Sequence, residues 1–293
     1  MATNNPSPLR YPGGKYKISR LIELLIGKSD SSCKTYVEPF AGGAGVALEM
    51  LLSGRVERIV INDSDRAIYS IWRALTTEGS AFLDKMMATG ISLEEWKRQR
   101  EIYLREKKYS LDYAFAAFFL NRTNHSGILS AGPIGGREQG AWKLGVRFVK
   151  DKLACQIARI VARRNDIKVY NQDAKYFIRN FLPRVGTDAF VYFDPPYYRK
   201  GRRLYDNFFT PELHRKLKEA ICTEVAQDWV VSYDDVPEIR DIYADCPSRP
   251  FTLDYSLANN GKGREIMFFK SRKLLPSTSE LEAIKMEKKF GVP

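Results

Sequence analysis

The 293-residue sequence predicts a doubly wound α/β fold with a mainly helical insert. Two observations predict it. Short apolar runs alternate with helical patterns at both ends of the chain, which is typical of a parallel sheet covered by helices. That alternation stops over residues 71–164, where long helical patterns follow one another. We therefore expect residues 1–70 plus 165–293 to form one domain and residues 71–164 to form a second, helical domain.

The composition favours a soluble protein without a metal site. No run of about 18 apolar residues is present, so we expect no transmembrane helix, and the N-terminal segment lacks the apolar core of a signal peptide. The four cysteines form no Cys-x-x-Cys pair, and only two histidines are present. We therefore expect a cytoplasmic protein with reduced thiols, no bound metal and no disulfide framework.

The charge of the chain indicates a polyanionic partner. The formal net charge is +12 and the pI is about 9.4. Residues 71–164 contain 17 basic and 9 acidic side chains, so about a third of the length carries two thirds of the excess. A basic surface concentrated on one unit is typical of nucleic-acid binding. The alternative is charge that only keeps the protein soluble, and such charge is expected to be spread over the whole chain.

Two glycine-rich turns open the predicted sheet. Residues 8–15 read Pro-Leu-Arg-Tyr-Pro-Gly-Gly-Lys and precede an amphipathic helix over 16–26. A strand over 35–38 is followed by the turn 39–45 and by an apolar helix that ends at Leu52. This order of strand, glycine-rich turn and helix is the nucleotide-binding unit of a doubly wound sheet. The spacings match neither a P-loop nor the Gly-x-Gly-x-x-Gly motif.

A second predicted strand, residues 58–61, ends in Asn-Asp-Ser-Asp. Asp63 follows the glycine-rich turn by about 20 residues, the distance at which an acid can hydrogen-bond the hydroxyls of a ribose. The same residues also suit a helix start, because Asp63 or Ser64 can cap it and Asp65 favours its positive end. Both Asp63 and Asp65 therefore remain candidate ribose ligands.

The predicted insert combines basic helices with a long polar loop. Helix 93–108 is amphipathic and basic, helix 111–120 is almost entirely apolar, and helix 149–164 is again basic. A glycine-rich loop starts at residue 121, and its polar side chains suit base edges and phosphates. The ordinary alternative for the basic helices is a solvated face. The candidate nucleic-acid contacts here are Arg98, Arg100, Asn121, Arg122, Asn124, Ser126 and Arg137.

Strand 167–170 and a helix starting at Asp173 restore the alternation, and strand 189–193 then runs into Asp-Pro-Pro-Tyr. Two prolines end this strand, and the carboxyl ends of such strands are where ligands bind. The Asp194 carboxylate and a proline carbonyl are fixed acceptors beside the flat face of Tyr197. This arrangement suits an amino group on an aromatic ring, and an ordinary Pro-Pro turn is the alternative.

The remaining chain closes the predicted sheet. We expect a helix over 211–225, a strand over 228–232 and a hairpin of 251–256 with 264–269. The last twenty residues are polar, which indicates a loosely packed tail. The basic residues just beyond the Pro-Pro turn are further candidate contacts to a nucleic-acid backbone, with a mobile loop as the alternative. They are Arg199, Lys200 and Arg202.

Taken together, these stretches resemble the Dam-type, or D12 class, family of DNA N6-adenine methyltransferases. The resemblance spans residues 8–270 and rests on five motifs that occur in the family's order. They are residues 10–15 (Arg-Tyr-Pro-Gly-Gly-Lys), 38–43 (Glu-Pro-Phe-Ala-Gly-Gly), Asn62-Asp63, Asn121-Arg122 with the following loop, and Asp194-Pro195-Pro196-Tyr197.

The resemblance implies a Rossmann-like S-adenosylmethionine-dependent methyltransferase fold, with S-adenosylmethionine as cofactor and residues 71–164 as the target-recognition region. It implies that Tyr11 packs against the cofactor, that Lys15 meets the methionyl carboxylate and that Asp173 lies near the adenine. It further implies cofactor-binding roles for Glu38, Phe40, Gly42, Asp63 and Asp194, and catalytic roles for Asp194, Pro195, Pro196 and Tyr197.

The implied activity is site-specific methylation of adenine N6 in double-stranded DNA, by direct in-line transfer to a flipped-out base. Neither a metal nor a membrane is required. A cognate restriction endonuclease is a further candidate partner, and we expect a monomer or a weak dimer. The alternatives are a cytosine N4 or RNA amino-methyltransferase and a non-catalytic nucleic-acid-binding protein with the same fold.

Overall fold

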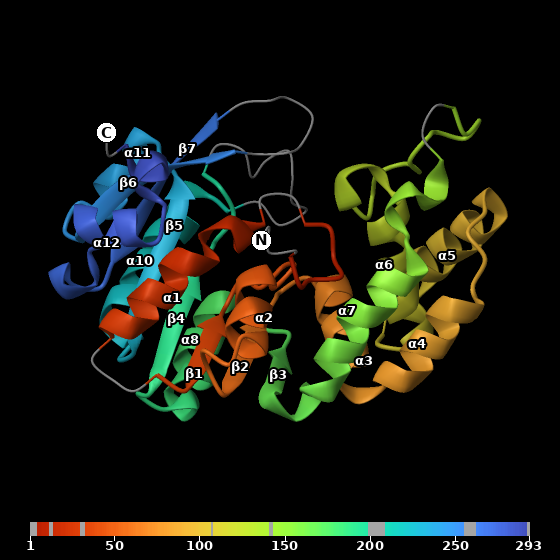
Figure 1. Ribbon diagram of the computed structural model, residues 1–293, viewed down its shortest axis with the longest axis horizontal. Coiled ribbons are helices and arrows are strands. Elements are labelled where there is room, and N and C mark those ends of the chain that lie inside the picture. The colour runs from red at the N-terminus through yellow and green to blue at the C-terminus, as the bar shows by residue number, and fades with distance from the viewer. Residues whose placement is uncertain are drawn as a thin grey trace.

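The computed structural model describes residues 5–11, 14–29, 33–106, 108–140, 143–198, 209–254 and 262–291. Its centre is a seven-stranded sheet with the order β3-β2-β1-β4-β5-β7-β6 (Figure 1). The strands are β1 (Thr35–Glu38), β2 (Arg58–Asn62), β3 (Ile167–Tyr170), β4 (Ala189–Phe193), β5 (Asp228–Asp234), β6 (Ser248–Asp254) and β7 (Lys262–Phe269).

Five strands of this sheet are parallel and two are not. Strands β1 to β5 pair in parallel, whereas β7 is antiparallel to both β5 and β6. The two central strands β1 and β4 are buried along their whole length, as expected for strands covered by helices on both faces. The chain leaves β1 towards β2 on one side and reaches β4 on the other, so the strand order reverses between β1 and β4.

The described helices fall into two groups, those that cover the sheet and those of the insert. The covering helices are α1 (Ser19–Lys28), α2 (Gly45–Leu52), α3 (Arg66–Thr77), α8 (Ala174–Asn180), α10 (Pro211–Glu224), α11 (Pro237–Ile242) and α12 (Thr278–Ala283). The insert helices are α4 (Gly79–Ala88), α5 (Leu93–Arg105), α6 (Leu111–Thr123) and α7 (Lys150–Ala162). Within the described residues, no helix is long and apolar enough to cross a membrane.

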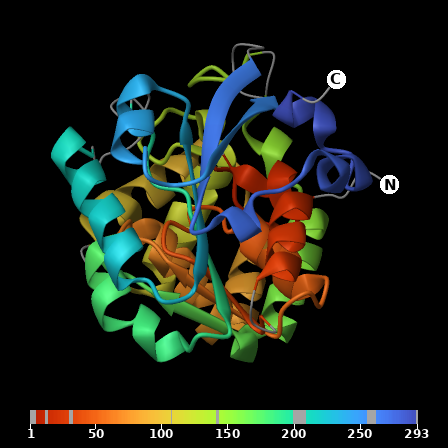
Figure 2. The ribbon, with the colours of Figure 1, turned by 90° about the vertical axis from the view of Figure 1, so that its left-hand side faces the viewer.

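Alternate residues of the strands face opposite layers of helices. On β4, Phe190 and Tyr192 join the buried cluster of α1, α2 and α3, whereas Val191 and Phe193 join the cluster of α8, α10 and α11. This follows from the period of two along a strand. Figure 2 shows α1 and α10 on opposite sides of the strands. The predicted doubly wound α/β fold is therefore confirmed.

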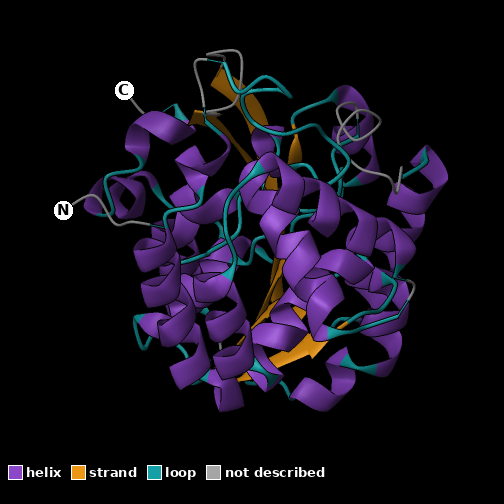
Figure 3. Cartoon of the chain, turned by 90° about the vertical axis from the view of Figure 1, so that its right-hand side faces the viewer, coloured by secondary structure: helices purple, strands orange, loops and turns teal. Residues whose placement is uncertain are grey.

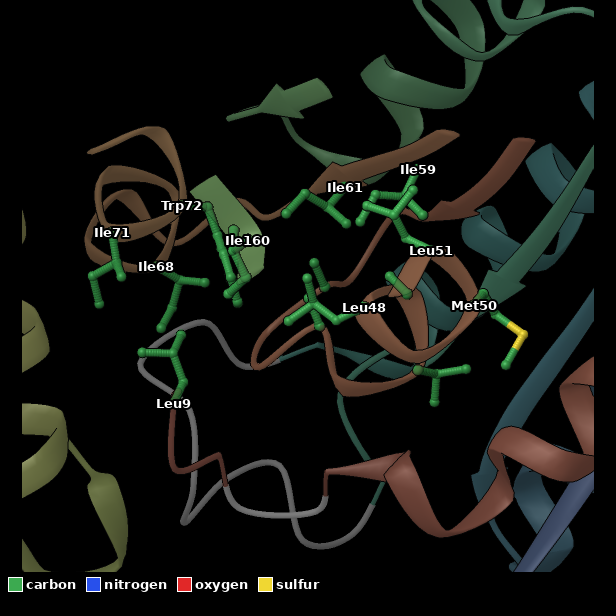
Figure 4. Close-up of a cluster of buried hydrophobic side chains, with 14 of the residues drawn as sticks. Leu9, Leu48, Met50, Leu51, Ile59, Ile61, Ile68, Ile71, Trp72 and Ile160 are labelled. Carbon is green, nitrogen blue, oxygen red and sulfur yellow. The ribbon is translucent and has the colours of Figure 1, made fainter. Parts of the chain in front are cut away.

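The helical insert lies beside the β3 edge of the sheet. Figure 3 shows its helices in front of the strands when the molecule is viewed from that side. Helix α3 is the shared element, because it packs on β3 and also on α6 and α7. In Figure 4, Trp72 of α3 and Ile160 of α7 lie close to Ile61 of β2. The hydrophobic core is thus continuous from the sheet into the insert, and the boundaries at residues 70 and 165 stay a prediction.

One sequence expectation about the fold is wrong. The last residues were expected to form a loose tail, but they contain α12 and a 3-10 helix, η7 (Glu287–Phe290). Leu281, Met286 and Phe290 are buried, and the Phe290 ring stacks on Phe251 of β6 with centroids 5.4 Å apart. Three apolar residues among many charged ones are a weak signal in the sequence. Here they are enough to dock the segment on the sheet edge.

Candidate active site

A cleft opens at the carboxyl ends of β1, β2 and β4, where the strand order reverses. Its walls come from the segment before α1, the turn after β1, the end of β2 and the Asp-Pro-Pro-Tyr segment after β4. The insert contributes a further wall through Tyr103 of α5 and residues 127–130. Ligands of open α/β sheets bind at such a reversal point. The cleft is therefore the candidate active site.

The glycine-rich turn after β1 forms the floor of this cleft and is covered by Tyr11. Gly42 has a φ of +45°, and a Cβ added there would lie 2.6 Å from the Tyr11 ring. Ala44, which precedes α2, has the same left-handed φ. Only a residue without a Cβ lets the ring approach the Gly42 backbone so closely. The turn thus presents bare backbone and an aromatic ring to a ligand.

Two acids at the end of β2 line the cleft and have different partners. Asp63 Oδ2 accepts a hydrogen bond from the Gly42 N–H at 2.7 Å, and Oδ1 accepts one from the Asp65 N–H at 2.9 Å. Asp65 caps α3 by accepting from the Ala67 N–H at 2.7 Å. Burial and the neighbouring Asp65 carboxylate raise the pKa of Asp63 to about 7. Asp63 therefore joins the glycine-rich turn to β2, whereas Asp65 starts the helix.

The Asp194 carboxylate is held from two sides. Its Oδ1 accepts hydrogen bonds from Lys15 Nζ at 2.8 Å and from the Ser232 hydroxyl at 3.0 Å. The Ser232 hydroxyl is in turn 2.7 Å from the hydroxyl of Tyr192. Within the described residues, Asp194 Oδ2 accepts no hydrogen bond, and the side chain is 24% exposed to the cleft. One carboxylate oxygen is thus fixed and the other remains for a donor in the cleft.

Tyr197 is tied to the same cluster through its hydroxyl. The hydroxyl donates to Glu265 Oε1 at 2.8 Å and accepts from Lys15 Nζ at 3.0 Å, and Lys15 Nζ also lies 4.8 Å from the centre of the Tyr197 ring. Burial alone would lower the pKa of Lys15, but the carboxylates of Asp194 and Glu265 raise it well above its usual range. Lys15 is therefore a permanent cation between two acids.

The structure places the other predicted cofactor residues as follows. Glu38 lines the cleft, and its Oε1 accepts from the Tyr36 hydroxyl and the Ala47 N–H, both at 3.0 Å. Burial raises the pKa of Glu38 to about 8. Phe40 also lines the cleft. Asp173 caps α8 by accepting from the Lys175 N–H at 3.0 Å and does not line this cleft.

Two of the predicted nucleic-acid contacts are buried in this structure, so their contact with DNA stays a prediction. Asn121 is 1% exposed, and its amide bonds the backbone of Arg10 in both directions, at 2.8 Å each. Asn124 is fully buried, where it accepts from the Trp96 indole N–H at 2.7 Å and donates to the backbone of residues 128 and 129. Their hydrogen-bonding groups are occupied within the protein. These amides shape the loop and do not project from it.

Arg122 belongs to a cluster of three arginines. It donates to the backbone oxygens of Pro8 and Arg147, and Arg10 donates to the Asn124 oxygen at 2.8 Å. Burial, together with the charges of Arg10 and Arg147, lowers the pKa of Arg122 to about 10. Among the described residues, no carboxylate forms a salt bridge with any of the three. Arg10 lies between the cleft residues Leu9 and Tyr11, and Arg122 directly follows the cleft residue Asn121. A positive cluster without a carboxylate partner therefore borders the cleft.

The remaining predicted contacts are exposed or partly exposed. Arg98 pairs with Glu95 at 2.7 Å, whereas the Arg100 guanidinium lies 5.3 Å from the Trp96 ring on another side of α5. Ser126 has a left-handed φ of 55° in the loop after α6, and Arg137 is exposed. A last set of predicted contacts lies outside the described residues. It consists of Arg199, Lys200 and Arg202.

Sequence reasoning missed several members of the site. Ser232 and Tyr192 sit inside strands that read as plain core, and Glu265 sits in a strand expected only to close the sheet. An acid flanked by Ile266 and three further apolar residues was a usable signal, because carboxylates are almost never fully buried without a partner. Arg10 belongs to the segment 10–15, in which the two glycines give the stronger signal, so its own role is not evident from the sequence.

Comparisons with known proteins find methyltransferases among the relatives of this chain. The chain is 24% identical over 204 residues to the type II methyltransferase M.MjaIII of Methanocaldococcus jannaschii, covering 64% of this chain and 68% of that protein. It is 25% identical over 221 residues to the modification methylase StsI of Streptococcus sanguinis, covering 69% of this chain and 31% of that protein. The chain thus spans about a third of the StsI methylase.

Solved structures with a similar chain trace include an rRNA methyltransferase and a spermidine synthase. The rRNA methyltransferase aviRa from Streptomyces viridochromogenes matches with a TM-score of 0.42 and 11% identity, covering 91% of this chain and 88% of that one. Spermidine synthase from Thermotoga maritima matches with a TM-score of 0.42 and 10% identity, covering 95% and 72%.

The family model described as D12 class N6 adenine-specific DNA methyltransferase matches residues 11–257, which is most of the chain. The match runs from the aromatic ring over the glycine-rich turn, through the acids after β2 and the insert, to the Asp-Pro-Pro-Tyr segment and beyond it. The chain therefore belongs to the D12 class of S-adenosylmethionine-dependent DNA methyltransferases that act on adenine N6.

Proposed function

We propose that this chain methylates adenine N6 at a specific site in duplex DNA, by direct transfer to a base rotated out of the helix into the cleft. The observation that carries the proposal is the Asp194 carboxylate after β4. Lys15 and Ser232 hold one of its oxygens, and the other accepts no hydrogen bond from the described residues. A fixed acceptor oxygen with no hydrogen-bond donor, beside a rigid proline backbone, suits an amino group that donates an N–H hydrogen bond.

The residues of the cleft fit S-adenosylmethionine. The absence of a Cβ at Gly42 lets the Tyr11 ring pack on the glycine-rich turn, so an aromatic ring and carboxylates line the same cleft. Asp63 offers carboxylate oxygens to the ribose hydroxyls, and we assign that role to it because its carboxylate is bonded to the glycine-rich turn at the Gly42 N–H, whereas the Asp65 carboxylate is bonded to the start of α3. When bound, the cofactor supplies a methyl group activated by a positive sulfur. Lys15 pairs with Asp194 here, so its predicted contact with the methionyl carboxylate is a separate proposal.

The chain's own groups then prepare the amine. Adenine N6 is a poor nucleophile, because its lone pair is delocalised into the ring. Hydrogen bonds from its two N–H groups to Asp194 Oδ2 and the Pro195 carbonyl favour a pyramidal nitrogen with an available lone pair. After the new N–C bond forms, the nitrogen releases one of these protons to Asp194 Oδ2 or to water. Tyr197 forms the aromatic wall on which the base stacks, a contact worth about 1–3 kcal/mol. Alignment supplies much of the rest, on the order of 7–11 kcal/mol in ideal cases.

The names of the two relatives support a further proposal about the biological setting. One is called a type II methyltransferase and the other a modification methylase. We propose that this chain is the methylating member of a restriction–modification pair. The partner endonuclease, the monomeric or weakly dimeric state and the cytoplasmic location stay predictions.

The proposal is tested by incubating the purified chain with methyl-labelled S-adenosylmethionine and mixed-sequence duplex DNA, followed by digestion to nucleosides. Label in N6-methyladenosine supports it, and sequencing then identifies the DNA site. Label in N4-methylcytosine would move the reaction to cytosine. If no nucleoside carries the label although the cofactor binds, and genomic DNA gives the same result, RNA becomes the next substrate to test. Failure to bind the cofactor would favour a non-catalytic protein.

Charge reversal at two positions on α5 is expected to show which side of that helix contacts DNA. Arg98→Glu alters an exposed, Glu95-paired side chain, whereas Arg100→Glu removes a cation from the Trp96 ring. If α5 contacts phosphates, each lost contact lowers the slope of log Kd against log salt by about 0.9. We expect the change for at least one variant, measured by DNA-binding titrations at several salt concentrations. Unchanged slopes in both would assign α5 to a solvated face.

Removing one charge from the arginine cluster is expected to weaken DNA binding. Arg147 is the exposed member of the cluster, so Arg147→Gln removes a charge with little loss of packing. We expect Kd to rise by about tenfold at low salt, because uncompensated arginines beside the cleft are placed for phosphates. Arg184→Gln removes an equal charge near the amino end of β4, and its Kd should not change. Equal effects of both substitutions would indicate net charge alone.

A further inference from the structure

A buried carboxylate on β7 is part of the active-site cluster. Glu265 lies beyond the residues matched by the family model and is only 1% exposed. Its Oε1 accepts the Tyr197 hydroxyl at 2.8 Å, and its Oε2 lies 3.5 Å from Lys15 Nζ. Among the described residues, Oε2 accepts no hydrogen bond. Glu265 therefore touches Lys15, which also bonds Asp194, and the Tyr197 hydroxyl, which Lys15 also bonds.

Packing does not explain an acid at this position. Removing a carboxylate from water costs several kcal/mol even after relaxation, so buried acids persist where they have a charged partner. The neighbours in β7 are Ile266, Met267, Phe268 and Phe269, and an apolar residue of similar size would continue that core. The charged partner of Glu265 is Lys15, which its Oε2 meets through an ionic contact at 3.5 Å.

The charges in the cluster are unbalanced when both acids are ionised. Lys15 is one cation shared by the Asp194 and Glu265 carboxylates, and its shorter contact is to Asp194, at 2.8 Å against 3.5 Å. The position of the ammonium group is therefore set by attraction from two sides. If Glu265 lost its charge, Lys15 would be drawn towards Asp194 alone, and the Tyr197 hydroxyl would lose its ionised acceptor.

We propose that Glu265 is a positioning residue for methyl transfer, whose charged carboxylate holds Lys15 and the Tyr197 hydroxyl and thereby orients the Asp194 carboxylate and the Tyr197 ring. The inference rests on the roles proposed above for Asp194 and Tyr197. It adds a residue from the antiparallel end of the sheet to a site otherwise built at the ends of parallel strands.

The proposal implies a pH dependence. The groups that face Glu265 from the cleft are Lys15 from the segment before α1, Asp194 and Tyr197 after β4, and Tyr192 within β4. On the neighbouring strand β5, the buried Asp234 is paired with Glu265, and its carboxylate accepts from the Tyr198 N–H at 2.9 Å. Burial raises the pKa of Glu265 from 4.5 to about 7, with Lys15 opposing the rise and Asp194 adding to it. The charged form is therefore gained as pH rises through about 7, and kcat should rise with it.

Two other cleft acids also titrate near neutral pH, so a variant is needed to assign that rise. Glu38 and Asp63 have pKa values raised to about 8 and about 7. Glu265→Gln keeps the size of the side chain and removes only its charge. We expect its kcat to fall about 10- to 100-fold at pH 8, the scale of a displaced catalytic group, with the KM for DNA within about threefold of wild type. The rise of kcat through pH 7 should flatten.

Asp235→Asn is the matched control. Asp235 is also a largely buried acid, at the end of the neighbouring strand β5, but it pairs with Arg240 at 2.6 Å and lies outside the cluster. We expect it to keep both kcat and the pH profile. A wild-type kcat in Glu265→Gln, a loss of kcat with an unchanged pH profile, or an equal loss in Asp235→Asn would each overturn the proposal.

A second measurement does not depend on methyl transfer. Tyrosine labelled with ¹³C at Cζ gives an NMR signal for Tyr197, identified by its absence in Tyr197→Phe. We expect this signal to shift with a midpoint near pH 7 in the wild type and to lose that shift in Glu265→Gln. An identical shift in both proteins would overturn the proposal. If the shift is lost but no adenine is methylated, the proposed function fails and the contact of Glu265 with Tyr197 stands.

Discussion

Asp194→Ala is expected to abolish turnover, with kcat lowered by about 10³-fold or more, the upper range for loss of one preorganised group. The substitution removes the acceptor that prepares the amine but leaves the proline backbone and the aromatic wall in place. Lys15 keeps contacts with Glu265 and Tyr197, so the cluster does not lose its cation. Single-turnover methylation with saturating cofactor measures the chemical step directly.

The binding behaviour of this variant separates chemistry from recognition. The arginine cluster and the insert are untouched, so the Kd for DNA should stay within about threefold of wild type. Asp235→Asn again serves as the control for loss of an acid at the end of a strand. Near-normal single-turnover rates in Asp194→Ala would show that the proposed role of this carboxylate is wrong. A parallel loss of DNA binding would indicate a role in recognition.

Lys15→Met is expected to destabilise the protein as well as inactivate it. The Lys15 side chain is 3% exposed and lies between two carboxylates, of which Glu265 is 1% exposed. Removing one member of a buried charged cluster leaves uncompensated charge and typically costs about 3–5 kcal/mol. Methionine retains the length and apolar character of the stem, so the loss should come from charge and not from a cavity. Urea unfolding of both proteins measures it.

The destabilisation by Lys15→Met should depend on pH in a defined direction. The folded-state pKa of Glu265 is already raised from 4.5 to about 7, and loss of the neighbouring cation raises it further. An acid with a raised folded pKa favours the folded state at low pH, and this advantage is lost as pH rises through that pKa. The variant should therefore be closest to wild type near pH 5 and furthest from it above about pH 8.

A pH-independent difference between the two proteins would contradict the charge explanation. It would instead indicate that the Lys15 stem contributes mainly by packing. Lys85→Met is a useful comparison, because Lys85 pairs with the Asp112 carboxylate at 2.7 Å while its side chain is 29% exposed. Exposed pairs contribute about 0–1 kcal/mol, so this control should cost little at any pH.

The sequence alone was sufficient for the parallel core of the fold. The strands at 35–38, 167–170 and 189–193 were predicted with the bounds that the structure has. Each is short, contains β-branched and aromatic residues, and has a proline or an acid directly beside it, so its signal is contained in a few neighbouring positions. The same locality placed Asp194 and Tyr197 correctly at the carboxyl end of β4, because two prolines must end a strand.

Only the tertiary structure decided which side chains meet in the cleft. Lys15 bonds Asp194 across 179 positions of sequence, and Glu265 joins them from the opposite end of the chain. No pattern in neighbouring residues encodes such contacts, because they result from the strand order. Burial was decided in the same way, since Asn121 and Asn124 look like exposed loop residues until Arg10 and Trp96 pack against them. Local chemistry thus determined the strands and the motif, and strand order determined the site.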